Sequence, residues 1–540
     1  MKETDMKKIA LMMLLALCMG MQAQGTTSWI PSDGLQVLTN AIDDKGRGKV
    51  TIKGRLTEKA EKKMKAVVEI WQDQRMIVRK QTNVNPGATF SVKYTLLNAD
   101  TWRADKPALY KAVYILYDGK EQIDQQQTTF AFRTFTQDNE KGLLLNNQPL
   151  KLRGFVWQEN LPWLKRINTE GKRAMLHRMQ EMGCNALMLK ACKENDDLYD
   201  IADEMGILLL IDLSGNDEQT IKETVYRLRN HPSVVIWTVG DLSLECSDEE
   251  MDNICRLTQS VRSADQTRLL TAGLKQVDKP LKKGVIDTLD ITALNNCPLR
   301  LYEASLKTKK RQVLSLNATT WQEKEREAYK QPWSLGQLLL SDLNMLVAQS
   351  DTFFLYRSEW NKREHTLHLA THWTRNKGEH VIVPVYTDYP TVELQLNGKS
   401  LGKEPKKVWQ VPYQEGTLTA IAYNNNGKEV QRTTLQTADK PIMVEAIAQT
   451  LGNLSITQLR VLDKDQNICS NFLQTVNISL EGDGTILGYT DGIRYTSVEA
   501  SQAAITLKEG HATVIIDGNG TLKAKANSLI GSKVFINHNH

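Results

Sequence analysis

The chain has 540 residues, of which 41% are hydrophobic and 24% are charged. This length exceeds what one hydrophobic core supports, so we expect roughly three to five domains of ordinary globular protein. The formal net charge is only +5, and no block of Lys and Arg is interleaved with aromatic residues as in a nucleic-acid groove, which excludes nucleic acid as an expected partner.

The first residues have the pattern of a secretory signal peptide. Lys7 and Lys8 precede an apolar run at residues 9–19, and a small-residue cleavage motif follows at residues 21–23. We therefore expect a signal peptide over residues 1–23 and export to a periplasm or beyond. The apolar run is too short to cross a bilayer and no later segment is long enough, so no transmembrane span is expected.

The next part of the chain alternates between apolar and polar residues in short runs. Examples are VTIKG at residues 50–54, AVVEIW at residues 66–71 and AVYIL at residues 112–116. A period of two residues, interrupted by polar or Gly/Pro turns, is typical of strands. About a hundred such residues predict an immunoglobulin-like β-sandwich, which we assign to residues 24–140.

From about residue 150 to 350, strands alternate with amphipathic helices. The helix AMLHRMQEM at residues 174–182 leads into a strand at residues 184–189, and another strand, ILLLID, lies at residues 207–212. This alternation predicts a parallel (β/α)8 barrel of the TIM type, assigned to residues 141–358. The segment is near the lower length limit of such barrels, about 200 residues, so we allow for trimmed or irregular last strands.

The remaining chain is expected to return to β-structure. We place its beginning at DTFFLYRSEW, residues 351–360, followed by strands within residues 367–373 and 392–402. Residues 359–438 are assigned to a second immunoglobulin-like β-sandwich and residues 439–540 to a C-terminal β-sandwich.

Several motifs together resemble glycoside hydrolase family 2, the β-galactosidase and β-glucuronidase family. NHPSVVIWTVGDL at residues 230–242 is similar to the family strand that ends in Asn-Glu, and TWRADKPALY at residues 101–110 resembles a segment of the family's first sandwich. FAFR at residues 130–133 and LNNQPLKLRG at residues 145–154 resemble the sequence motifs that lead into the family's barrel. The resemblance covers nearly all of the mature chain and implies a barrel flanked by sandwiches, a role in carbohydrate metabolism and no cofactor. It leaves no room for the family's N-terminal sugar-binding domain.

The family's reaction requires two carboxylates flanking the glycosidic bond, about 5 to 5.5 Å apart when configuration is retained. The resemblance places the acid/base position at Leu242 and the nucleophile position at Asn317, and neither side chain is a carboxylate. The Arg and His that shape the family's sugar subsite are also replaced, at Met188 and Ala191. We therefore expect no catalytic residue at the family positions, and an inactive homologue that binds a carbohydrate or a protein partner.

The alternative is an active retaining β-glycosidase, similar to β-galactosidase, with a relocated pair of carboxylates. Asp241 and Glu245 lie at the end of the same strand and in the loop that leaves it, and they are the fallback catalytic candidates. An acid of this kind would have a raised pKa and face a second carboxylate.

Aromatic residues can hold a sugar without cleaving it. Trp157, Trp163 and Trp321 fall near the predicted carboxyl ends of barrel strands, where ligand sites of this fold lie, and Glu159 is next to the first two. Because an indole face offers a large rigid apolar surface, we expect these four residues to contact substrate. For Trp237, which is inside a strand, core packing is the favoured role.

No metal site is expected. The chain has seven cysteines, but those beyond the predicted signal peptide form no CxxC pair and lie at no metal-ligand spacing with histidine. His365 and His368 are an odd number of residues apart, so on a strand they would face opposite sides. The sequence leaves the sugar, its linkage, the partner and the oligomeric state open.

Overall fold

The computed structural model describes residues 28–61, 63–157, 161–192, 195–296, 307, 311–318, 330–339, 344–405, 407–491 and 494–537. The predicted signal peptide at residues 1–23 lies outside these ranges. The chain divides into two compact units. The first combines residues up to Ala99 with Leu109–Ala131, and the second combines Asp100–Ala108 with Phe132 and the residues that follow.

The first unit is a sandwich of two antiparallel sheets, with strand orders β1-β2-β5 and β4-β3-β6-β7. Its facing side chains are apolar and closely packed: the rings of Phe90 and Tyr114 stack with centroids 4.0 Å apart. A Cβ at Gly54 would lie 1.6 Å from the Phe90 ring, so only glycine fits beneath it. The strands are β1 (Leu35–Thr39), β2 (Gly48–Ala60), β3 (Met64–Gln72), β4 (Arg75–Val84), β5 (Gly87–Leu96), β6 (Tyr110–Asp118) and β7 (Glu121–Phe130).

A short excursion between β5 and β6, Asp100–Ala108, belongs to the second unit. Trp102 is fully buried there. Its backbone N–H donates to the carbonyl of Phe132 at 2.9 Å, and its indole N–H donates to the carbonyl of Asp203 at 2.8 Å. The tryptophan of the TWRADKPALY segment therefore fixes this excursion to the helices around the barrel.

The second unit contains a closed parallel barrel of eight strands, in which β18 pairs back onto β11. This confirms the predicted TIM-type barrel, with all eight strands present. The strands are β11 (Leu152–Val156), β12 (Ala186–Lys190), β13 (Leu208–Asp212), β14 (Val234–Leu242), β15 (Leu269–Leu274), β16 (Thr292–Asn295), β17 (Val313–Ala318) and β18 (Ser334–Leu339).

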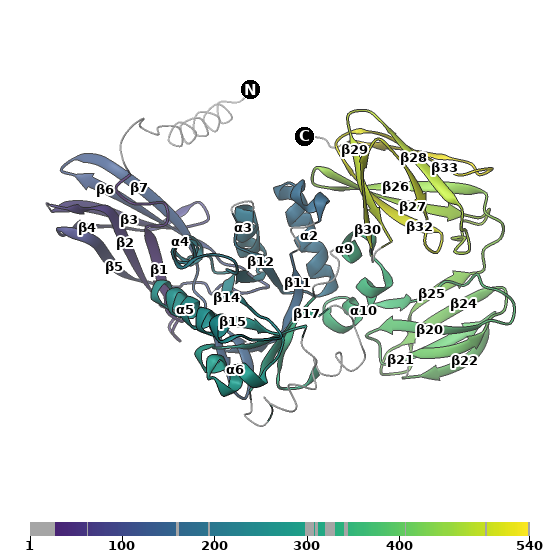
Figure 1. Ribbon diagram of the computed structural model, residues 1–540, viewed down its shortest axis with the longest axis horizontal. Helices are drawn as coiled ribbons and strands as arrows, with labels where there is room; N and C mark the ends of the chain where they lie inside the picture. Colours follow the sequence, from purple (N-terminus) through teal and green to yellow (C-terminus); the bar gives the residue numbers. More distant parts are fainter. Residues whose placement is uncertain are drawn as a thin grey trace. The chain divides into compact units, whose positions relative to one another are not determined.

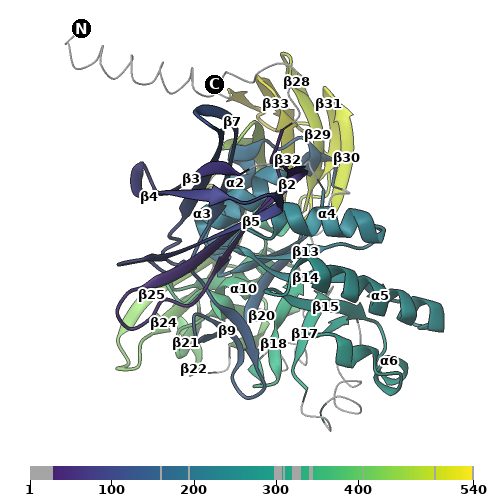
Figure 2. The ribbon, with the colours of Figure 1, turned by 90° about the vertical axis from the view of Figure 1, so that its left-hand side faces the viewer.

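The helices of the first half of the barrel have clear sequence boundaries. Asn168 caps α2 by accepting from the backbone N–H of Gly171, and Ser247 and Glu250 form a capping box at the start of α5, as favoured helix ends do. Figure 2 shows α4 and α5 side by side along strands β13 to β15. The described helices between β15 and β16 are only one or two turns long. The helices are α2 (Thr169–Met182), α3 (Asp196–Met205), α4 (Glu218–Leu228), α5 (Asp248–Ala264) and α6 (Asp278–Lys282), with 3-10 turns η1 (Pro162–Lys165) and η3 (Val285–Thr288).

The expectation of β-structure at residues 351–360 is wrong, because this segment is the helix α10 (Asp351–Trp360). Phe353, Tyr356 and Trp360 are buried, and their spacing of three and four residues puts them on one helical face. The contiguous aromatic and aliphatic side chains conceal this helical period from a reading based on local β-propensity.

Two further antiparallel sandwiches follow (Figure 1). The first pairs sheets β19-β20-β23 and β22-β21-β24-β25, and the second pairs sheets β26-β27-β32-β29-β30 and β31-β28-β33-β34. None of the helices in the described ranges is long and apolar enough to cross a membrane. The strands are β19 (Leu367–Leu369), β20 (His380–Thr387), β21 (Thr391–Leu396), β22 (Lys399–Glu404), β23 (Val408–Pro412), β24 (Thr417–Tyr423), β25 (Glu429–Gln436), β26 (Met443–Leu451), β27 (Leu454–Leu462), β28 (Thr475–Glu481), β29 (Thr485–Thr490), β30 (Tyr495–Ala500), β31 (Gln502–Thr506), β32 (His511–Asp517), β33 (Gly520–Lys525) and β34 (Ser532–Ile536).

Candidate functional site

Polar side chains gather where the barrel strands end. Lys190 closes β12, Asp212 closes β13, Asp241 is the penultimate residue of β14, and Asn295 closes β16. Lys190 and Asp212 are direct neighbours in the parallel ladder. Because ligands of TIM barrels bind at the carboxyl ends of the strands, this cluster is the candidate site of the second unit.

Asp241 is an exposed carboxylate held in place by a neighbouring strand. The side-chain amide of Asn295 donates to Oδ2 of Asp241 at 2.6 Å. Gly273 is the ladder partner of Asp241, and a Cβ on it would lie 1.9 Å from Oδ1 of Asp241. The missing side chain at Gly273 therefore makes the space that the carboxylate occupies.

Asp212 has a raised pKa, which marks it as a candidate acid. Burial raises the pKa most, the hydrogen bonds from Ser214 partly offset this, and the negative charge of Asp241 raises the pKa further. Both donors come from Ser214: its backbone N–H bonds Oδ1 and its hydroxyl bonds Oδ2, each at 2.9 Å. The positive charge of Lys190 acts in the opposite direction. Two carboxylates in unlike environments thus interact at the barrel mouth, as in acid/base pairs.

The side chain of Leu242 points into the core, opposite to that of Asp241. It is fully buried and pairs in the ladder with the buried Leu274. A register shift occurs between Thr238 and Asp241, and Gly240 has a φ of 126°, a backbone conformation that side chains disfavour. Because successive side chains on a strand face opposite sides, this irregular end exposes Asp241 and turns Leu242 into the core.

The other candidates are spread over described and undescribed parts of the chain. Asn317 lies on β17, but its side chain is outside the described structure, as are Glu159 and Trp321. Glu245 is exposed in the loop after β14. Trp157 and Trp163 are 4% and 0% exposed and pack in the barrel core. Their expected contact with a sugar stays a prediction.

Sequence reasoning singled out Asp241 but not the groups around it. Lys190, Asp212 and Asn295 lie far apart in sequence, and only closure of the barrel brings their strands together. A signal was available: Asp212 is the polar residue that ends the predicted strand at residues 207–212, the position where barrels carry functional side chains.

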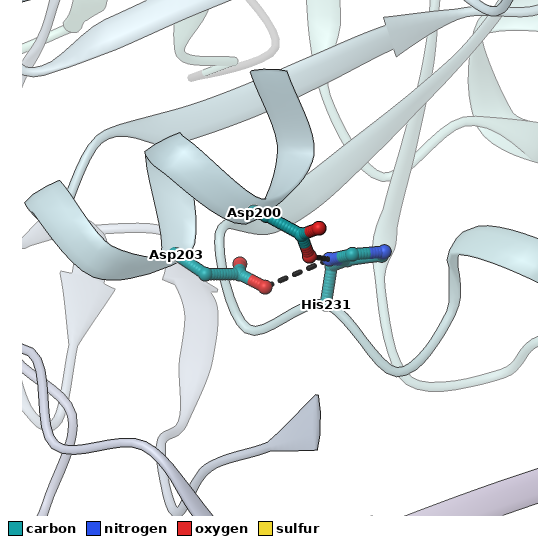
Figure 3. A group of neighbouring side chains, drawn as sticks. All are labelled: Asp200, Asp203 and His231. Carbon is teal, nitrogen blue, oxygen red and sulfur yellow. Dashed lines mark hydrogen bonds and ion pairs between the residues drawn. The ribbon is translucent and has the colours of Figure 1, made fainter. Parts of the chain in front are cut away.

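The amino-terminal end of β14 is organised by a buried carboxylate (Figure 3). Asp203 on α3 is 1% exposed; its Oδ2 contacts Nδ1 of His231 at 2.7 Å, and its Oδ1 accepts from the backbone N–H of Ser233 at 2.9 Å. Burial lowers the pKa of His231, but the charge of Asp203 and its hydrogen bond outweigh this and leave the pKa raised. The His-Pro-Ser motif therefore serves to fasten the strand entry to α3.

Two arginines complete this anchor. Arg133 donates to the carbonyls of Pro232 and Val234 at 2.7 and 2.6 Å, and Arg268 donates to the carbonyl of His231 at 3.1 Å. Guanidinium groups suit such multiple bonding because their donors form a fixed fork. The arginine of the FAFR motif thus stabilises the bottom of the barrel.

The tryptophan of the strand is also structural. The indole N–H of Trp237 donates to Oδ2 of Asp265 at 3.0 Å, and Asp265 lies 3.7 Å from Arg268 in an ion pair. Trp237 is fully buried, in agreement with its favoured role in the core.

Asp200, Asp203 and His231 bring three possible metal-ligand atoms within 4.8 Å of one another. Asp200 is exposed, and its carboxylate is 3.9 Å from the ring of His231. Both oxygens of Asp203 already accept hydrogen bonds, so the group is explained as an anchor. His365 and His368 diverge, as expected from their spacing: they contact Asp388 and Asp351, respectively, each at 2.6 Å.

The second unit has a TIM-type barrel with polar groups at the carboxyl ends of its strands and β-sandwiches after it. Residues 33–133 match the model "Glycosyl hydrolases family 2", and residues 215–333 match "Glycosyl hydrolases family 2, TIM barrel domain". Residues 378–431 match a domain of unknown function, DUF4982. The chain is therefore a homologue of glycosyl hydrolase family 2.

Curated relatives and solved structures agree with this. A Formosa agariphila protein named "Putative beta-glucuronidase" is 25% identical over 87% of this chain, and "Beta-galactosidase BoGH2A" of Bacteroides ovatus is 24% identical over 75%. The aligned parts span 54% and 62% of the length of these relatives. A glycosyl hydrolase family 2 member from Bacteroides cellulosilyticus shares the fold with a TM-score of 0.77 at 22% identity, covering 94% of this chain and 79% of its own.

Proposed function

We propose that this chain is a family 2 homologue that binds carbohydrate at the barrel mouth without hydrolysing it. The observation that carries the proposal is the burial of Leu242, which the family resemblance places at the acid/base position. A leucine cannot donate a proton to the leaving oxygen, and loss of a general acid typically costs about 10² to 10⁴ in rate.

The groups that would bind the sugar are Asp241, Asn295 and Lys190. The carboxylate of Asp241 is exposed and fixed by Asn295, so it is preorganised to accept hydrogen bonds from sugar hydroxyls. Charged hydrogen bonds of this kind contribute about 1.5–3 kcal/mol. Replacing Asp241 by Asn should therefore weaken sugar binding about 10- to 100-fold.

A second function, hydrolysis by a relocated pair, is favoured by one specific observation. Asp212 has a raised pKa and interacts with the charge of Asp241. In this alternative Asp212 is the acid and Asp241 is the second carboxylate, which the side-chain amide of Asn295 positions.

The two functions are separated with nitrophenyl β-galactoside and β-glucuronide, together with calorimetry on the corresponding free sugars. The variants are Asp212→Asn, Asp241→Asn and Glu245→Gln, with Glu249→Gln as a control on an exposed carboxylate at the start of α5. Binding without turnover, weakened by Asp241→Asn and unchanged by Glu249→Gln, supports the binding function. Turnover that falls by about 10² or more in Asp212→Asn would establish hydrolysis instead.

Export is proposed from the basic and apolar pattern of residues 1–23. Expression with this segment should yield a periplasmic or secreted product whose N-terminus begins near Gln24. Recovery of the uncleaved chain from the cytoplasm would refute it.

A further inference from the structure

A cavity of about 400 Å³ lies in the second unit, and none of its described lining residues belongs to the cluster at the barrel mouth. Its walls come from residues 348–354 at the start of α10, from β27 and β32 of the last sandwich, and from the turns near residues 491 and 509. We propose that this cavity is a second carbohydrate site that holds a neutral sugar unit. The inference does not rest on the barrel mouth binding a sugar.

The floor of the cavity is built by two neighbouring strands. Gln458 and Arg460 are two residues apart on β27 and so share one face, and their ladder partners on β32 are Thr513 and His511. All four line the cavity. The sheet thus presents an amide, a guanidinium, a hydroxyl and an imidazole together, a mixture of donors and acceptors that suits sugar hydroxyls.

The charges around the cavity are largely compensated by one another. Asp351 contacts His368 at 2.6 Å, Lys508 lies 3.7 Å from Asp491, and Arg460 bonds Glu445 at 2.6 Å. A carboxylate or phosphate ligand would meet Asp351, Asp491 and Glu509, and the lysine and arginine of the described lining are already paired. This balance favours a neutral polar ligand over a charged one.

An aromatic wall also matches a sugar. Phe354 stacks on His368 with ring centroids 4.1 Å apart, beside these polar groups.

The size is also suitable, since small-molecule sites commonly enclose about 300–1,000 Å³ and combine apolar walls with a few placed polar groups. The apolar part comes from Phe354 and Ile468.

The test measures binding of galactose, glucose, mannose, lactose and cellobiose to the full chain by saturation-transfer NMR and calorimetry, with glucuronate as the charged probe. Gln458→Trp fills the cavity, and Thr513→Val and Gln458→Ala each remove one polar group of its floor. Gln431→Ala, on an exposed strand of the preceding sandwich, is the matched control. Thermal unfolding verifies that each variant is folded.

We expect a neutral sugar to bind, with affinity abolished in Gln458→Trp and reduced about tenfold by each polar removal, the equivalent of one hydrogen bond. Gln431→Ala and the barrel-mouth variant Asp241→Asn should leave this binding event unchanged. The proposal is overturned if no neutral probe binds, if glucuronate binds more tightly, or if only Asp241→Asn abolishes binding. If only Asp241→Asn abolishes sugar binding, the barrel-mouth function stands and the cavity proposal fails. If only the Gln458 variants abolish it, the cavity proposal stands and the barrel-mouth function fails.

Discussion

Removing the carboxylate of Asp203 should destabilise the barrel far more than removing that of its neighbour Asp200. Asp203 is 1% exposed and accepts from both His231 and Ser233. The Asp203→Ala change leaves the histidine and a backbone N–H without these acceptors. Asp200 is exposed on the same helix, and its carboxylate is 3.9 Å from His231, so Asp200→Ala is the matched control.

The magnitude follows from burial. Breaking a buried pair by removing one partner costs about 3–5 kcal/mol, whereas an exposed ion pair contributes about 0–1 kcal/mol. For a barrel of about 150–250 residues, each kcal/mol shifts the unfolding midpoint by roughly 2–4 °C. Asp203→Ala should therefore lower the midpoint of the barrel by about 6–20 °C, and Asp200→Ala by less than about 4 °C.

Scanning calorimetry is the appropriate assay, because a chain of several domains does not unfold in one two-state transition. The measurement follows the barrel endotherm in the wild type and both variants. Equal shifts for Asp200→Ala and Asp203→Ala would refute the assignment of Asp203 as the anchor of β14.

The same pair predicts a pH dependence. The pKa of His231 is raised in the folded chain, so its contribution to stability is fully present below the unfolded value of about 6.5. That contribution is lost as the pH rises through the folded-state pKa. The midpoint difference between wild type and Asp203→Ala should thus be larger at about pH 5.5 than at about pH 8.5; an increase with pH would contradict this.

Three further changes have defined outcomes. Leu242→Glu buries a carboxylate without a partner and should cost more than about 2 kcal/mol without creating turnover of nitrophenyl glycosides, and a gain of activity would contradict the buried, core-facing position of this side chain. Gly154→Ala puts a Cβ 1.7 Å from the carbonyl oxygen of Ala186 and should cost at least about 3 kcal/mol, seen as lost soluble yield or a lowered unfolding midpoint. Trp102→Phe removes the donor to the carbonyl of Asp203 and should destabilise the second unit by about 1–3 kcal/mol in calorimetry, and no change would show that the bond contributes little.

The fold was predictable because each of its signals is local. The strand ILLLID and the helix before it are recognised from runs of apolar residues a few positions long, and β13 (Leu208–Asp212) lies where that pattern puts it. Helix α10 was missed for the same reason: Phe353 to Tyr356 are contiguous apolar residues whose helical period only shows once the buried face is known. Asp241 was found from its place at a strand end, whereas its hydrogen-bond donor Asn295 is 54 residues further along the chain. No local pattern specifies a pair that only barrel closure brings together.

The motif at residues 230–242, which first linked this chain to the family, has different roles at the two ends of β14. At the amino end, His231, Ser233 and Trp237 are bound by Asp203 and Asp265, while Arg133 holds the strand's first carbonyls. These bonds stabilise the barrel, whatever it binds. At the carboxyl end, Leu242 is packed in the core, and the polar groups at the mouth are Asp241 and its neighbours. Since TIM barrels keep stability at the amino face and function at the carboxyl face, similarity over residues 230–240 is evidence about folding. Evidence about activity has to come from Asp212, Asp241 and Asn295.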